Sequence, residues 1–336
     1  MNQWKRVASI AVLAATLHAC SGGTTPRGDV TPSDAMLTDS VVSDAPPSDA
    51  NARSCPLPNY PDETCTGVPS GTSLRRVPAD VTSGPGWMWD GDGAIQVTVD
   101  GTVLDGLEVA GCISVEATGV TVRNTRAQCI TTGSSPRARD PMSPRLTIED
   151  CEVVCPDMDG TTAIGDRNIN VYRVNIHGCE NGFDMDSDAE IHDSYIHDLH
   201  QSVIAHTDGL QSAVGTNLLI DHNRFYAETP GACGDPSGHT ADCGGTSAIN
   251  INNNPAGPIS ANTTVIHNLI AGGAYTLYCP MPATMNFRVV DNQWSTIFYP
   301  NGGAYGTSSD CRVTMPGVSE WSGNVWKETG AAVDAQ

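Results

Sequence analysis

Acidic side chains and a histidine occur close together near the middle of this 336-residue chain. Asp184, Asp186 and Asp188 stand at alternate positions, and His206 precedes Asp208 by two residues. Carboxyl and imidazole groups can exchange protons near neutral pH, so these residues are candidates for general acid–base catalysis. Alternate side chains of a strand project from one face, so the three aspartates could also hold a hard cation. Ca²⁺ is therefore the candidate cofactor, although the segment lacks the twelve-residue calcium-loop signature.

These residues lie within a repeat that runs through most of the chain. Seven segments superpose without gaps, with a β-branched residue at the third position and an apolar residue at the eighth. The segments are Val120–Ala127, Leu146–Val153, Ile169–Ile176, Ala189–Ile196, Leu218–Phe225, Thr263–Ile270 and Phe287–Trp294. Periods of 20–50 residues are typical of solenoids, and no sustained 3.6-residue stripe is present, so the coils are predicted to consist of strands.

A second strand is predicted beside each of these segments, because one apolar position recurs there. That inward position is occupied by Ile113, Ile130, Ile164, Phe183, Leu210, Ile249 and Leu277. Strands that stack like residues on like every ~4.8 Å form a parallel β-helix. The predicted fold class is therefore all-β, a single-stranded parallel β-helix of about ten coils. Asn223, Asn268 and Asn292 share the sixth segment position and are expected to stack inside it.

The positions that follow the inward residues are expected to form outward columns. The first column reads Ser114, Thr131, Gly165, Asp184, Gln211, Asn250 and Tyr278. The second, two residues further on, reads Glu116, Gly133, Arg167, Asp186, Ala213 and Asn252. Side chains repeated every ~5 Å suit a linear saccharide, so these columns predict a polysaccharide-binding surface. The substrate-binding residues expected on it are Gln211, Asn250, Asn252 and Tyr278. For the asparagines, a ladder that only satisfies turns is the alternative.

Three short motifs mark the start, the middle and the end of the repeat region. They are Thr66-Gly67-Val68-Pro69-Ser70-Gly71-Thr72, His206-Thr207-Asp208-Gly209-Leu210-Gln211 and Trp321-Ser322-Gly323-Asn324-Val325-Trp326. Together they resemble a large group of secreted bacterial proteins within the pectate-lyase-like class of right-handed parallel β-helices. The resemblance covers about residues 58–327. It implies right-handed coils and a polysaccharide lyase that cleaves a uronate-containing polymer by β-elimination.

β-Elimination needs a base next to the uronate and a cation or amide that neutralises the uronate carboxylate. In pectate-lyase-like enzymes the base is often lysine or arginine. Lys327, near the end of the chain, is the only lysine of residues 55–336. The predicted base is therefore Arg167 or His206.

Two alternatives to a lyase remain open. A glycoside hydrolase needs two carboxyl groups, one of them protonated, about 5–9 Å apart. Asp184 and Asp208 fall in neighbouring coils and would form such a pair. The other alternative is a surface protein that binds glycans without catalysing a reaction.

The charge balance limits the classes of partner. The chain has 17 Lys and Arg against 38 Asp and Glu, and its formal net charge is −21. Recognition of nucleic-acid phosphates needs clustered basic residues, so a general nucleic-acid binder is excluded. The same charge disfavours a polyuronate unless a cation at Asp184 and Asp186 offsets it. We expect a monomer whose partner is an extracellular polysaccharide.

The N-terminus carries features of export and anchoring. Lys5 and Arg6 precede an apolar run from Val7 to Leu17 that is too short to span a bilayer. Leu17-His18-Ala19-Cys20-Ser21 then resembles a bacterial lipoprotein signal, which implies lipidation of Cys20 and sorting to the outer membrane. Residues 1–20 are thus predicted to be the signal peptide, 21–54 a disordered Pro/Ser/Asp/Ala linker and 55–336 the β-helix domain. We expect the protein to be anchored at the cell surface or, without lipidation, secreted.

Cysteine positions predict five disulfides and one buried thiol. Cys112 and Cys129 occupy the same position of adjacent coils, which would bring their Cα atoms to ~5 Å. The predicted pairs are Cys55–Cys65, Cys112–Cys129, Cys155–Cys179, Cys233–Cys243 and Cys279–Cys311. Cys151 falls at an interior position and is left as the thiol. Disulfides are typical of an oxidising compartment, which argues against a zinc site at these cysteines.

Overall fold

The computed structural model describes residues 53–232, 244–251, 260–280, 285–312 and 318–336. All of them belong to the second of the chain's two units, Ala50–Gln336. The described residues form strands joined by turns and contain no α-helix. Accordingly, no helix among them is long and apolar enough to cross a membrane. The predicted signal peptide, residues 1–20, and most of the predicted linker, residues 21–54, lie outside the described residues.

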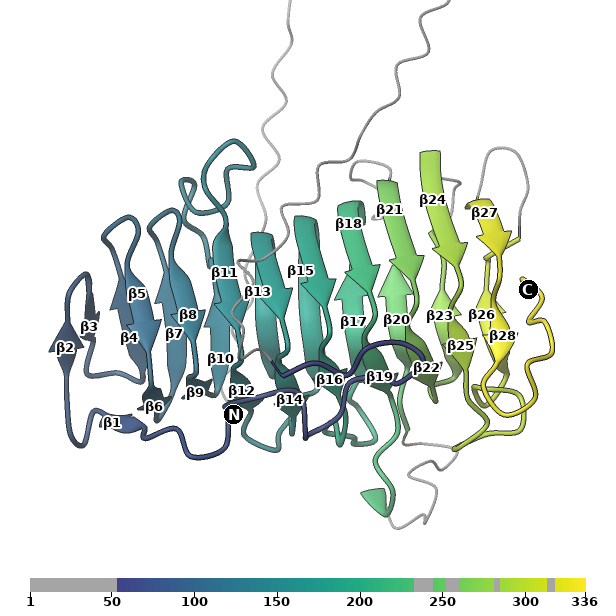
Figure 1. The fold of residues 1–336 in the computed structure, drawn as a ribbon, viewed down its shortest axis with the longest axis horizontal. Helices are drawn as coiled ribbons and strands as arrows, with labels where there is room; N and C mark the ends of the chain where they lie inside the picture. Colours follow the sequence, from purple (N-terminus) through teal and green to yellow (C-terminus); the bar gives the residue numbers. More distant parts are fainter. Residues whose placement is uncertain (1–52, 233–243, 252–259, 281–284, 313–317) are drawn as a thin grey trace, which may run out of the picture. The chain divides into compact units, whose positions relative to one another are not determined.

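The described residues of the unit form two sheets of mostly parallel strands, one of ten strands and one of 18. The ten-stranded sheet consists of β1 (Arg75–Val77), β6 (Leu107–Val109), β9 (Arg126–Ala127), β12 (Glu152–Val154), β14 (Asn175–His177), β16 (Tyr195–Ile196), β19 (Arg224–Tyr226), β22 (Leu269–Ala271), β25 (Gln293–Trp294) and β28 (Val325–Trp326). Each strand pairs in parallel with the next one in this order, so successive coils stack (Figure 1).

The 18-stranded sheet contains two rows of parallel strands. One row is β4 (Ala94–Val97), β7 (Cys112–Val115), β10 (Cys129–Thr131), β13 (Thr162–Tyr172), β15 (Asn181–His192), β17 (Asp208–Ser212), β20 (Ser247–Ile251), β23 (Tyr275–Tyr278) and β26 (Gly306–Ser309). The other row is β5 (Val103–Asp105), β8 (Thr121–Arg123), β11 (Leu146–Glu149), β18 (Thr216–Asp221), β21 (Ala261–Ile266), β24 (Met285–Val290) and β27 (Val318–Ser322). The long strands β13 and β15 belong to both rows. The first coil adds an antiparallel pair, β2 (Ser83–Gly84) and β3 (Trp87–Trp89).

The register confirms the predicted inward position. Ile113, Ile130, Ile164, Phe183, Leu210, Ile249 and Leu277 pair in succession and are all fully buried. Identical rise at every coil places like residues over like, so burial of one apolar side chain per coil builds a continuous core. The architecture is therefore all-β, with stacked parallel strands as in a solenoid.

A buried asparagine column also lies where it was predicted. The side-chain oxygen of Asn268 accepts the backbone N–H of Asn223 at 2.9 Å, and the oxygen of Asn292 accepts that of Asn268 at 2.9 Å. Asn324 continues the column beyond Asn292. The residue before each of these asparagines adopts a left-handed conformation, as His222 does with φ 55°. Each of these side-chain amides thus satisfies backbone groups in the turn of the preceding coil, as buried backbone groups require.

The N-terminal segment of the unit lies across the ten-stranded sheet (Figure 1). His222 Nε2 and the Asn59 carbonyl are 2.9 Å apart, and Arg224 Nη2 donates to the Tyr60 carbonyl at 3.0 Å. A disulfide between Cys55 and Cys65 closes this segment into a loop. These contacts fix residues that are distant in sequence against β19 and the turn before it.

Four of the predicted disulfides are present in the structure. They are Cys55–Cys65, Cys112–Cys129, Cys155–Cys179 and Cys279–Cys311. Cys151 is a buried free thiol, as expected. The predicted pair Cys233–Cys243 lies outside the described residues. The last three of the four bridges join successive coils, because like positions of neighbouring coils are about 5 Å apart.

Candidate functional site

The first outward column is continuous in the structure. Asp184 pairs with Gln211, Gln211 with Asn250, and Asn250 with Tyr278. Tyr278 pairs in turn with Ser309, which extends the column by one coil. All five side chains are half-buried, as expected for residues on the outer face of a sheet. We call this row of residues the strip. Asn252 of the second predicted column lies outside the described residues.

Three carboxyl groups and two guanidinium groups meet at one end of the strip. The Asp186 carboxylate binds Arg139 Nη2 at 2.7 Å and Arg167 Nη2 at 3.1 Å. Asp184 lies close enough to Asp166 and Asp186 for the charges of both to act on it. We call these five residues the acidic cluster. Arg167, one of the two predicted bases, is therefore engaged in an ion pair.

A β-bulge shapes the acidic cluster. The register between β13 and β15 shifts after Asp166, so that Asp166 pairs with Met185 and Arg167 pairs with Ser187. Asp186 is thus the extra residue of β15. The prediction that Arg167 and Asp186 share one register position is wrong for this reason. Bulges re-aim side chains, and this one brings the Arg167 guanidinium to the Asp186 carboxylate.

The Asp184 carboxyl is the titratable group of the acidic cluster that faces the strip. Burial raises its pKa, and the negative charges of Asp186 and Asp166 raise it further. A hydrogen bond with Gln211 acts in the opposite direction. Asp166 accepts a hydrogen bond from the Thr131 hydroxyl at 2.8 Å. Burial and neighbouring negative charge both disfavour the ionised form, so the Asp184 carboxyl keeps its proton to a higher pH than an ordinary aspartate does.

The second predicted acid, Asp208, is buried with 1% of its surface exposed. Ser247 Oγ donates to Asp208 Oδ1 at 2.5 Å, and Asn250 Nδ2 donates to Asp208 Oδ2 at 3.3 Å. Burial raises the pKa of Asp208 to about 7, and the charge of Glu180 adds to this shift. Its carboxyl therefore binds the Asn250 amide of the strip and is closed to solvent.

Gly209 explains how Asp208 reaches this place. A Cβ on Gly209 would lie 2.9 Å from Phe225 Cδ1 and 2.5 Å from the Ala248 carbonyl oxygen. The side of Gly209 that would carry a Cβ therefore faces the packed interior, as does Leu210 after it. Two successive inward positions leave Asp208 on the outer side, where Asn250 binds it. Only glycine fits such a close approach of two coils.

His206 lies at the surface, two residues before Asp208 in the chain. Its side chain is exposed and makes no hydrogen bond with the described residues. Its backbone N–H donates to Glu180 Oε1 at 3.0 Å, and Gly160 N–H donates to Glu180 Oε2 at 2.5 Å. Glu180 thus anchors the segment that carries His206. The sequence did not indicate this role, because Glu180 does not occupy a recurring position of the repeat.

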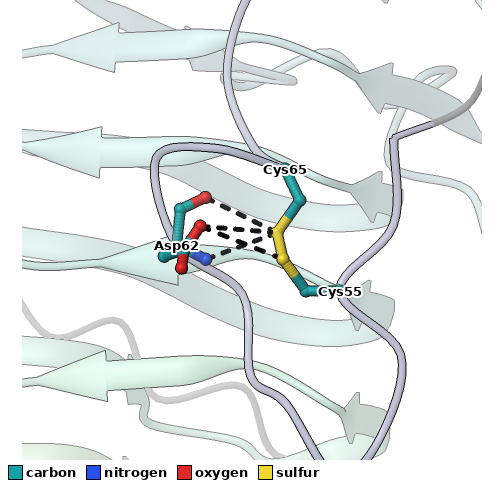
Figure 2. A group of neighbouring side chains, drawn as sticks. All are labelled: Cys55, Asp62 and Cys65. Atoms are coloured by element: carbon teal, nitrogen blue, oxygen red, sulfur yellow. Dashed lines mark hydrogen bonds between the residues drawn. A yellow bond between two sulfur atoms is a disulfide. The ribbon is translucent and has the colours of Figure 1, made fainter.

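The predicted calcium ligands do not come together as one group. Asp188 has φ 56° and accepts a hydrogen bond from Asn217 Nδ2 at 2.8 Å, in an exposed ladder of turn residues. Among the described residues, Cys55, Asp62 and Cys65 form the one group of three candidate ligands whose atoms all lie within 4.8 Å (Figure 2). The two sulfur atoms of this group form a disulfide, so they are not available as thiolate ligands.

Arg139 and Asp166 were also missed from the sequence. Arg139 belongs to the segment between β10 and β11, which Asn168 fastens through hydrogen bonds to the carbonyls of Ala138 and Asp140. Residues of this segment do not occupy recurring positions of the repeat, so the sequence pattern could not predict where Arg139 lies. Asp166 directly follows Gly165, which pairs with Asp184, so Asp166 stands next to the first outward column without belonging to it.

Comparison of the chain with protein-family models, with curated proteins and with solved structures found no match. The chemistry of the site therefore has to be inferred from its own side chains. These offer a carboxyl group with a raised pKa, two neighbouring carboxylates, two guanidinium groups and a row of amide and hydroxyl groups along successive coils.

Proposed function

We propose that the protein is a polysaccharide-acting enzyme whose substrate lies along the strip and is hydrolysed at the acidic cluster. The observation that carries this proposal is the place of Asp184. The pKa of its carboxyl is raised, and the charges of two further carboxylates, Asp186 and Asp166, act on it. Asp184 is also the first residue of the strip and pairs with Gln211 in the next coil. A linear polymer needs such a row, because each sugar unit must meet a similar set of polar groups.

Hydrolysis of a glycosidic bond needs one protonated and one ionised carboxyl group. In this proposal Asp184 donates its proton to the leaving glycosidic oxygen. Asp166 acts as the carboxylate that accepts a proton from the attacking water, whose hydroxyl adds to the anomeric carbon. Asp186 is held by Arg139 and Arg167, so it keeps the charge of the cluster balanced and raises the pKa of Asp184. This assignment replaces the pair Asp184 and Asp208, because Asp208 is buried.

β-Elimination of a uronate-containing polymer is the second candidate. Arg139 and Arg167 favour it, because a uronate carboxylate that approaches Asp186 would meet two guanidinium groups. His206 would be the base, since its imidazole is exposed and Arg167 is engaged with Asp186. Ca²⁺ bound at the aspartates is part of this second candidate only. Glycan binding without catalysis is the outcome if neither reaction is detected.

Incubation with a panel of neutral and uronate polysaccharides tests the proposal. We expect new reducing ends without ultraviolet absorbance from an unsaturated product, and no dependence on calcium or on a chelator. Asp184→Asn should lower the rate at least about a hundredfold while the melting temperature is kept. Asp105→Asn, an exposed carboxyl paired with Arg123, is the control and should leave the rate unchanged. Unsaturated product, or full activity of Asp184→Asn, would refute hydrolysis at this cluster.

We further propose the finer details of the fold and of its location. The three sequence motifs support a right-handed β-helix of about ten coils in the pectate-lyase-like class. The disulfides fit an oxidising compartment, and the Cys20 signal supports anchoring to the outer membrane. Cys20→Ala should move the protein from the membrane fraction to the soluble fraction of cells that export it. Retention of the variant in the membrane fraction would refute the lipid anchor.

A further inference from the structure

A cavity opens where the strip ends in the last coils. Its volume is about 550 Å³, within the range of roughly 300–1,000 Å³ that is typical of small-molecule sites. Tyr275, Tyr305, Ser309, Asp310 and Arg312 are among the residues that line it. The lining thus combines two aromatic rings with hydroxyl, carboxylate and guanidinium groups, which is the composition of a site for a polar ligand with one apolar face.

The cavity is continuous with the strip. Ser309 lines the cavity and also pairs with Tyr278 of the strip. The Tyr275 ring, in the cavity wall, packs edge-on against the Tyr278 ring with centroids 5.5 Å apart and an interplanar angle of 85°. A polymer that follows the strip from Asp184 through Asn250 would therefore reach the cavity next, one coil beyond Tyr278.

The aromatic wall is open to solvent. Tyr305 is 71% exposed, and its ring centroid lies 5.9 Å from that of Tyr275. The negative face of an aromatic ring attracts the polarised C–H groups on the flat side of a pyranose, so the two tyrosines fit a sugar ring.

Arg312 supplies a positive charge to this cavity, whose lining also includes the Asp310 carboxylate. Arg312 forms no ion pair with the described residues, whereas most arginines there, such as Arg288 with Glu320, do. Asp310 accepts a hydrogen bond from Ser309 Oγ at 3.2 Å. A guanidinium without an ion-pair partner at a cavity can bind a carboxylate or a sulfate through two parallel hydrogen bonds, which favours an anionic ligand.

We propose that this cavity is an end subsite that binds a sugar unit carrying an anionic group, either a carboxylate or a sulfate. The ring of that unit stacks on Tyr305, and its anionic group binds Arg312. The inference rests on the proposed function for the polymer that continues along the strip, but the subsite itself binds without any bond being cleaved.

Calorimetric titration with three trisaccharides tests the subsite. The probes are trigalacturonate, a sulfated galactose trisaccharide and the neutral cellotriose, and the protein carries Asp184→Asn so that no probe is cleaved. We expect one or both anionic probes to bind at least about tenfold more tightly than cellotriose. Tyr305→Ala and Arg312→Gln should each weaken that binding about tenfold or more. Arg75→Gln, at an exposed arginine on β1, is the matched control and should change nothing.

The outcomes separate this inference from the proposed function. Weaker anionic binding in both cavity variants supports the subsite, and the preferred probe shows whether it accepts carboxylate or sulfate. If this result is found while the unmodified protein cleaves no polysaccharide, the subsite stands and the hydrolase proposal fails. Equal affinity in all variants, or no binding of either anionic probe, overturns the subsite even if polysaccharides are cleaved.

Discussion

At the scale of single residues, burial decides which carboxyl group can react. Burial raises the pKa of Asp208 to about 7, but its carboxyl is enclosed by Ser247 and Asn250. Burial also raises the pKa of Asp184, but this carboxyl is only half-buried on the strip, where a ligand can reach it. A catalytic acid must be within hydrogen-bond distance of its substrate, so access ranks before the size of a pKa shift.

The raised pKa of Asp208 predicts how stability depends on pH. In the unfolded chain its carboxyl titrates near the ordinary value of 3.8, and in the folded protein near 7. The folded state therefore binds the proton more tightly, and the resulting stabilisation is fully present below about pH 4. It is lost as the pH rises through 7, by up to about 4 kcal/mol.

Asp208→Asn should remove this dependence, because the amide resembles the protonated acid and carries no charge. We expect thermal unfolding of the variant to change less between pH 4 and 8 than that of the unmodified protein, and the variant to be more stable at pH 8. His222, whose pKa is also raised, contributes a loss of the same sign in both proteins, so the difference between them isolates Asp208. Parallel pH profiles would contradict this account of the carboxyl.

At the scale of elements, we expect the two asparagine ladders to contribute differently to the free energy of unfolding. Asn268 belongs to the buried ladder, and its amide group donates to the carbonyls of Ile220 and Ile266 at 2.8 Å each. Asn262 belongs to the exposed ladder of turn residues and donates to Asn217 Oδ1 at 3.2 Å. Loss of a buried partner leaves unsatisfied groups without water, whereas an exposed turn is rehydrated.

Asn268→Ala should therefore lower the free energy of unfolding by about 2–4 kcal/mol, because several backbone groups of neighbouring coils lose their partners. Asn262→Gly is the matched control. Its φ of 54° suits glycine, so its cost should stay below about 1 kcal/mol. Urea denaturation of both variants measures the difference. Similar losses would show that burial does not distinguish the ladders.

At the scale of the whole unit, stability is a sum of contacts between neighbouring coils. Among the described strands, β26 pairs with β23 only, whereas β23 also pairs with β20, so a covalent link matters most at β26. The Cys279–Cys311 disulfide joins the coil of β23 to that of β26 and closes a loop with a sequence separation of 32 residues. A bridge of this span stabilises mainly by restricting the unfolded chain.

Replacing Cys279 and Cys311 together with serine should lower the free energy of unfolding by about 3 kcal/mol. Limited proteolysis should then cut first within the last coils, because these open before the centre of the stack. Cys151→Ser, at the buried thiol, is the control with a cost of about 1 kcal/mol or less. Unchanged proteolysis of the double variant would contradict a role of this bridge in holding the end.

The sequence was informative wherever the repeat applied. The inward row from Ile113 to Leu277 and the strip residues Gln211 and Asn250 follow from one regularity, the constant rise per coil. Prediction from the repeat failed at Asp186, where one extra residue in β15 shifts the register. It also failed at Asp188, whose left-handed conformation places its side chain in the exposed ladder. Local irregularities of this kind carry no periodic signal.

The amino-acid sequence by itself determined the parallel β fold, the disulfide pairs that could be compared and the row of side chains that forms the strip. These depend on spacing along the chain, which stacking converts directly into position. Only the tertiary structure decided that Asp208 is enclosed, that Arg139 reaches Asp186 and that Tyr305 and Arg312 share a cavity. Burial and contacts between segments without a repeat position depend on how bulges and loops fold over the coils, and no spacing encodes them.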